Sequence, residues 1–189
     1  MKRFVLSSLL LAAAGQAAAE KADAYRPTRI VCRACDADSL TGTFTVAGGV
    51  ELTRGTLKIE ADGGRVEDSA QGYQRLLLEA LPGRKVRFRQ KADGPGERWM
   101  EGEADRVEYD DRTGMVKLFS KAKVRRSLDG FQTEEAEGEY ISYDSRTEEF
   151  TLRNTSTGED RPGGGRNTII LQSKRRPPPA PAVAGTEAR

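Results

Sequence analysis

Two cysteines, Cys32 and Cys35, are the residues of this 189-residue chain whose type and spacing best suit covalent chemistry. In an oxidising compartment a C-x-x-C pair can act as a catalytic dithiol, close a local structural disulfide or stay as two free thiols. Catalytic pairs usually open a helix that activates one thiol, whereas the residues that follow here, DADSLTG, indicate a loop or a strand. We therefore expect a disulfide between Cys32 and Cys35, with redox catalysis and free thiols as the alternatives.

The other common reactive constellations cannot be assembled from this sequence. The chain has no histidine and only two cysteines, which excludes Ser-His-Asp and Cys-His nucleophiles and a four-ligand N/S zinc site built by one chain. No glycine-rich phosphate loop separates a strand from a helix. Carboxylates are plentiful, but they alternate with apolar residues, and Asp110 and Asp144 occupy turn positions where side chains cap backbone donors. We expect no enzymatic activity, no cofactor and no metal site.

An internal repeat organises the middle of the chain. The segment from Glu101 to Leu118 returns thirty-four residues later and ends at Leu152, so that GEADRVEYDDRTGMVKL is matched by EGEYISYDSRTEEFTL. Apolar residues alternate on each side of a polar turn, as Val107 and Tyr109 do, which predicts a hairpin whose strands have one apolar face. A weaker copy spans residues 50–66. One such unit cannot bury its apolar face alone, and we expect the units to stack into an elongated β structure.

The composition fits a thin sheet better than a thick globular core. Hydrophobic residues make up 37% of the chain and charged residues 32%.

Residues 74–81 lack β-branched side chains, which favours a helix, but their place between turn signals and the next strand predicts a strand. Further strands are expected within residues 29–35, 43–66, 85–89 and 167–172, with a bulge at 48–49 and turns at 54–55, 62–64 and 157–166.

Both ends of the chain have compositions of their own. A basic start, an apolar run and small residues before Glu20 predict a signal peptide over residues 1–19 that is cleaved on export. Residues 20–28 are expected to form a flexible N-terminal segment, and the basic, Pro-rich residues 173–189 a disordered tail. Cleavage removes Lys2 and Arg3 and leaves 29 basic residues against 29 acidic ones, so the net charge gives no indication of nucleic-acid binding.

Four segments together carry a family resemblance. They are VAGGVELTRGTLKIEAD at 46–62, GRKVRFRQ at 83–90, WMEGEADRVEYDDRTGMVKLFSKAKV at 99–124 and AEGEYISYDSRTEEFTL at 136–152. In this order they resemble the OstA-like family of periplasmic proteins over residues 29–172, whereas the C-x-x-C pair and the Pro-rich tail depart from the family pattern. The resemblance implies an all-β fold, an elongated OstA-like β-jellyroll of stacked antiparallel strands that is V-shaped and open along one side.

The resemblance also implies a function in lipopolysaccharide transport. Family members of this length hold lipopolysaccharide in an apolar groove in the periplasm and associate end to end as homo-oligomers. They thereby bridge an LptC-like inner-membrane transport component and an LptD-like outer-membrane translocon. The alternatives are a membrane-tethered or purely structural OstA-like β-solenoid and, from a different class, a periplasmic dithiol protein that uses Cys32 and Cys35. Because no nucleotide site is visible, a partner must drive any movement of the lipid.

The period-two pattern selects the residues expected to line the groove. Each lies on the apolar face of a predicted strand, and ordinary core packing is the alternative for each. These residues are Phe44, Val46, Val50, Leu52, Leu57, Ile59, Leu76, Leu78, Val86, Phe88, Val107, Tyr109, Val116, Leu118, Val124, Ile141, Tyr143, Phe150 and Leu152.

Overall fold

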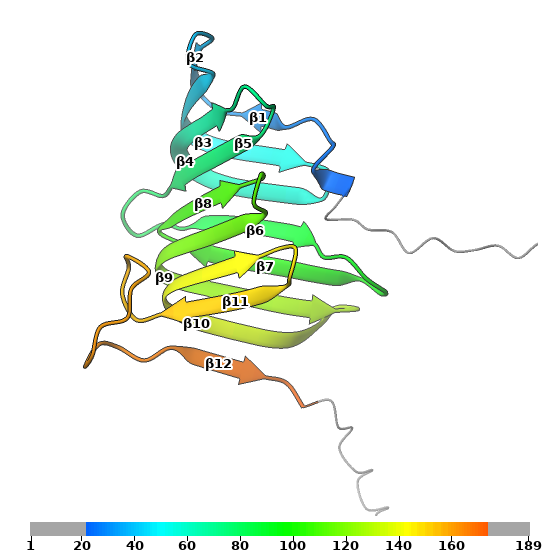
Figure 1. Cartoon of the computed structure of the whole chain (residues 1–189), viewed down its shortest axis with the longest axis vertical. Helices are drawn as coiled ribbons and strands as arrows, with labels where there is room; N and C mark the ends of the chain where they lie inside the picture. The colour runs from blue at the N-terminus through cyan, green and yellow to red at the C-terminus, as the bar shows by residue number, and fades with distance from the viewer. Residues whose placement is uncertain (1–21, 174–189) are drawn as a thin grey trace, which may run out of the picture.

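The structure, a computed structural model, describes residues 22–173, so the predicted signal peptide and nearly all of the predicted tail lie outside the described residues. After the end of a short helix at residues 22–23, the described chain is a single antiparallel system of strands stacked along one long axis (Figure 1). The strands are β1 Arg29–Val31, β2 Ala34–Asp38, β3 Thr43–Arg54, β4 Leu57–Asp68, β5 Gln74–Glu79, β6 Val86–Lys91, β7 Arg98–Ala104, β8 Arg106–Asp110, β9 Met115–Leu128, β10 Phe131–Asp144, β11 Glu149–Arg153 and β12 Thr168–Leu171.

Four long strands, β3, β4, β9 and β10, bend in the middle and pair with different partners on each side of the bend. The start of β4 pairs with β6 through residues 58–60, whereas its end pairs with β5 through residues 63–68. Likewise β9 pairs with β8 through residues 115–119 and with β7 through residues 123–128. Each long strand therefore belongs to two sheets, and the two sheets share a line of bends.

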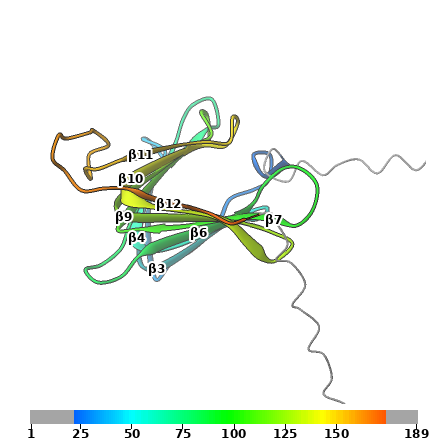
Figure 2. The ribbon, with the colours of Figure 1, turned by 90° about the horizontal axis from the view of Figure 1, so that it is seen from below.

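We call these two sheets the first arm and the second arm. The first arm contains β1, β6, β7, β12 and residues 50–54, 57–61, 122–128 and 131–138 of the long strands. The second arm contains β2, β5, β8, β11 and residues 43–47, 63–68, 115–119 and 140–144. Viewed along the long axis, the arms diverge from the bends as the two limbs of a V (Figure 2). The all-β, V-shaped fold expected from the sequence is confirmed.

The line of bends, which we call the crease, is built from ladder irregularities. The register of β3 with β4 shifts between Ala47 and Val50, where Gly48 and Gly49 have φ of 81° and 86°, which confirms the predicted bulge. The prediction of a turn at residues 62–64 is wrong, because Gly63 continues the ladder of β4 with both β3 and β5. The Asp-Gly-Gly sequence is instead the crease of β4.

The inner faces of the two arms pack against each other as one hydrophobic core. Its largest fully buried side chains come from both arms and from strands far apart in the sequence: Leu52, Leu78, Leu118, Ile141 and Tyr143. The outer faces carry the intervening charged residues, as an alternating pattern on a half-buried sheet requires.

Several local predictions are confirmed by the backbone. Residues 74–79 form a strand, and the repeat forms two hairpins, β8–β9 and β10–β11. Asp110 Oδ1 accepts hydrogen bonds from the backbone N–H of Arg112 and Thr113, and Asp144 Oδ1 accepts one from Arg146, which matches the predicted turn capping.

Candidate functional site

All the residues predicted to line a groove lie on the inner faces of the arms. Most of them are buried, and Phe44, Phe150 and Leu152 are partly exposed but pack against the same cluster. The structure therefore brings every predicted position together, and it does so as one continuous apolar interior whose two sides touch.

One row of neighbouring residues, which crosses the strands on the inner face of the first arm, shows where the apolar interior ends. Through the strand registers Phe88 is followed by Gly102, Val124, Ala136 and Ile169, which share one face of the first arm. A Cβ at Gly102 would overlap the Phe88 ring, so glycine here leaves the space that the ring occupies. At the end of the row Ile169 is 61% exposed. The apolar interior is thus closed in the middle of the stack and uncovered at β12.

The open side of the V, opposite the crease, is lined by hairpin turns, and we call it the mouth. Turns of the first arm cover residues 55–56, 92–97 and 129–130, and turns of the second arm cover residues 69–73, 111–114 and 145–148. At the mouth the inward positions change from apolar to polar. On the inner face of β3, Arg54 follows Leu52. The inward positions of β6, β7 and β9 nearest the mouth likewise include polar residues, which are Gln90, Arg98 and Arg126.

Arg54 links the arms across the mouth near β1. Its Nη1 lies 2.8 Å from Asp111 Oδ2, and its Nη2 donates a hydrogen bond of 2.7 Å to the Tyr109 hydroxyl. Asp111 also accepts a hydrogen bond from the backbone N–H of Gln74 through its other oxygen. The Arg54 side chain is 5% exposed and the Asp111 side chain 9%, so this is a buried ion pair between the two arms.

A second group of charged residues links the arms nearer β12. Arg98 Nη2 lies 3.1 Å from Glu148 Oε2, and Arg126 Nη2 donates a hydrogen bond of 2.8 Å to the Glu148 carbonyl oxygen. The Arg126 guanidinium also lies 4.3 Å from the centre of the Phe150 ring. These side chains line a cavity of about 290 Å³, whose apolar walls include Met100, Leu128 and Tyr143.

The segment before β1 also closes part of the mouth. Asp23 is buried and accepts hydrogen bonds from the Thr56 backbone N–H at 2.9 Å and from Gln90 Nε2 at 3.2 Å. Thr28 Oγ1 donates a hydrogen bond of 2.5 Å to Gln74 Oε1 on the second arm. The segment that the sequence predicts to be flexible, residues 20–28, is therefore anchored at both ends of its described part.

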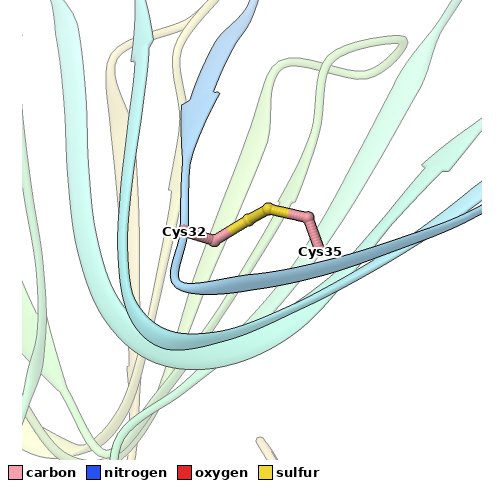
Figure 3. The surroundings of a disulfide bond; sticks show 2 residues. All are labelled: Cys32 and Cys35. Carbon is pink, nitrogen blue, oxygen red and sulfur yellow. A yellow bond between two sulfur atoms is a disulfide. The ribbon is translucent and has the colours of Figure 1, made fainter.

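Cys32 and Cys35 form a disulfide whose Cα atoms are 6.1 Å apart. Cys32 directly follows β1 in the first arm, and Cys35 lies in β2 of the second arm, so the bond joins the arms at the crease. It spans the inside of the bend between the two strands (Figure 3). Since a strand corner, and not a helix, surrounds the pair, the site lacks the environment that activates a catalytic thiol.

The outer face of the first arm is a ladder of alternating charges. Lys123 lies 2.9 Å from Glu135 and 2.6 Å from Glu137, and Arg125 lies 2.9 Å from Glu135. Hydrogen bonds from Lys123 and then from Arg125 lower the pKa of the Glu135 carboxyl, whereas those to Glu137 and Glu135 raise the pKa of Lys123. These pairs are partly exposed, so they stabilise the ladder weakly and are screened by salt.

Sequence analysis missed the charged residues of the mouth. Their signal is a break in an apolar alternation: Arg54 and Arg126 occupy positions that the period of two assigns to the core. A charged residue at an inward position near a strand end indicates that the end reaches the mouth.

Two further classes of site are absent from the described part of the chain. Within residues 22–173, no group of three or more Cys, Asp or Glu side chains is placed to hold a metal ion. In that same part of the chain, no helix is long and apolar enough to cross a membrane.

Comparisons with known proteins agree with this architecture. Residues 29–149 match a family model described as "LptA/(LptD N-terminal domain) LPS transport protein". Among solved structures, the chain is similar to LptH of Pseudomonas aeruginosa, described as the LptA homologous periplasmic component of the conserved lipopolysaccharide transport device. The TM-score is 0.67 and the sequence identity 19%, over 80% of this chain and 99% of that chain. No curated protein sequence matches the chain.

Proposed function

Because the family model matches well over half of its length, the chain belongs to the LptA and LptD N-terminal family of lipopolysaccharide transport proteins, and from this premise we propose that it carries lipopolysaccharide itself. In this proposal the acyl chains lie between the arms, on the inner faces that carry the predicted groove residues. The protein acts in the periplasm after export, and the expected signal peptide supplies the export.

The apolar interior is the observation that carries the proposal. It runs the length of the stack, is uncovered at β12, and is not crossed by a backbone ladder at the mouth within residues 22–173. An acyl chain that replaces contacts between the arms gains about 0.8 kcal/mol for each methylene it buries. The arms can therefore exchange packing against each other for packing against lipid, which retains the lipid without covering it completely.

The ends of the stack support the second part of the proposal, an end-to-end bridge. Within residues 22–173, β1 and β2 pair only with β3, and β11 and β12 pair only with β10, so each end presents free strand edges. Free edges of opposite ends can pair in a head-to-tail contact that repeats without closing. The proposed partners are further copies of this chain, an LptC-like inner-membrane component and an LptD-like outer-membrane translocon.

Site-specific photocrosslinking in cells tests the lipid part of the proposal. A photoreactive residue at Phe88 or Leu118, both on inner faces, is expected to give lipopolysaccharide adducts, whereas one at Lys117 on the outer face is not. The positions Leu118 and Lys117 are a matched pair, since they are neighbours in β9. With folding verified by circular dichroism, the absence of adducts at both inner positions would leave a structural or tethered β protein.

A further inference from the structure

The cavity at the mouth lies where an amphiphile in the interior would place its headgroup. Arg98 and Arg126 reach it from the first arm, and the buried Met100 continues its wall toward the apolar core. Arginine recognises phosphate and carboxylate through paired, planar hydrogen bonds. A guanidinium at the rim of an apolar interior thus suits an anionic headgroup whose acyl chain points inward.

The anion that Arg98 holds in the structure is the protein's own Glu148. Its backbone has a φ of 58°, in the left-handed region that residues with a Cβ seldom adopt. The internal repeat makes the choice of residue informative, because the equivalent position thirty-four residues earlier is Gly114, with a φ of 70°. The second hairpin thus has a glutamate where the same turn takes glycine, and that side chain extends across the mouth.

We propose that Arg98 and Arg126 form a binding site for the phosphate-type headgroup of an amphiphile, and that Glu148 occupies this site until the ligand displaces it. The proposal rests on the proposed lipid carriage and adds the headgroup class and the closing contact. In the structure Arg98 pairs with Glu148, and Arg126 Nη1 lies 3.3 Å from Glu134 Oε2. Release of Glu148 makes the Arg98 guanidinium available to the anionic headgroup of the ligand.

The test compares two amphiphiles with the same chain, dodecyl phosphate and neutral dodecyl maltoside, both below micelle formation. Isothermal titration calorimetry measures the affinity of the protein for each amphiphile. We expect the wild-type protein to bind dodecyl phosphate at least tenfold more tightly than dodecyl maltoside. The Arg98→Gln/Arg126→Gln variant should lose that preference, to within about threefold, while still binding both amphiphiles.

Glu148→Gly tests the displacement itself. Glycine is the residue of the equivalent turn and accepts the left-handed backbone, so the variant is expected to fold at least as well as the wild type. Its affinity for dodecyl phosphate should rise severalfold, with little change for dodecyl maltoside. Arg87→Gln, which removes an outer-face arginine paired with Glu103 at 3.4 Å, is the matched control and should change neither affinity.

Each result decides between named alternatives. Equal affinities for the two amphiphiles, or a preference that persists in the Arg98→Gln/Arg126→Gln variant, would overturn the headgroup site and leave lipid carriage standing. Inorganic phosphate that binds as tightly as dodecyl phosphate would show a site for a free anion and overturn the headgroup assignment. If neither amphiphile binds, the proposed lipid carriage fails, and the headgroup site fails with it.

Discussion

The buried ion pair between Arg54 and Asp111 gives the sharpest stability prediction. Asp111→Asn keeps the shape of the side chain and the oxygen that accepts the Gln74 N–H, but it removes the negative charge. Arg54 then remains as a buried cation whose Nε already lacks a hydrogen-bond partner among residues 22–173. Breaking one side of a buried pair destabilises proteins by about 3–5 kcal/mol. Since the Tyr109 hydroxyl still accepts from Arg54, we expect a loss of about 3 kcal/mol.

Urea unfolding followed by circular dichroism at pH 7 measures this loss. In a chain of this size about 3 kcal/mol corresponds to a Tm lower by roughly 6–12 °C. The double variant Arg54→Met/Asp111→Asn removes both charges and should return to within about 1 kcal/mol of the wild type. Glu103→Gln breaks an exposed pair and serves as the control, with a change of about 0.5 kcal/mol or less. If Asp111→Asn costs less than about 1 kcal/mol and the double variant shows no recovery, Arg54 and Asp111 do not form a stabilising buried ion pair between the arms.

Three further predictions concern the interior, the crease and the outer face. Gly102→Ala places a methyl group against a buried phenylalanine ring and is expected to lower the free energy of unfolding by about 1–3 kcal/mol in urea denaturation. Cys32→Ser/Cys35→Ser opens a very short covalent loop and should lower it by about 2 kcal/mol on the chain-entropy model, with reduction of the wild type giving the same loss. Glu135→Gln removes a carboxyl whose pKa is lowered by hydrogen bonds from Lys123 and then a neighbouring arginine, so its contribution is present above about pH 4.5 and lost as pH falls through the folded-state pKa. The stability curves of wild type and variant, measured against pH, should therefore converge in acid.

A specific result would refute each of these three predictions. A Gly102→Ala protein as stable as the wild type would mean that the interior has room for the methyl group. Cysteine variants that unfold at the wild-type urea concentration would remove the disulfide from the list of stabilising contacts between the arms. Curves for Glu135→Gln that run parallel to the wild type from neutral pH to acid would show that its ion pairs do not form in solution.

The alternation of apolar residues was enough to predict the strands and the inner faces, because a sheet with one buried side imposes a period of two on its sequence. Val50 with Leu52 and Ile141 with Tyr143 follow it without exception. Local turn signals were less reliable at Asp62, where glycines that often end a strand instead let β4 bend while its ladder continues.

The contacts of the mouth could not be predicted because they join strand ends that are distant in the sequence. Arg54 and Asp111 are 57 residues apart, and no periodicity states which turn of the second arm lies opposite a given turn of the first. The repeat marks Tyr109 and Tyr143 as equivalent, but only the three-dimensional arrangement shows that each lies beside an arginine.

The crease has a consequence for motion. The ladder of β3 with β4 shifts register at the crease, the ladder of β9 with β10 shifts there between Gly138 and Tyr140, and β9 passes it with left-handed residues at Ser120 and Lys121. These irregularities lie on one line, so the arms can rotate about it as about a hinge, through changes in a few backbone dihedrals. Such a rotation keeps the hydrogen bonds within each arm and breaks only the side-chain contacts of the mouth and the packing between inner faces. Because the ladders within each arm stay intact, widening the gap moves each arm as one sheet, and the proposed lipid would enter the interior without the loss of a backbone hydrogen bond.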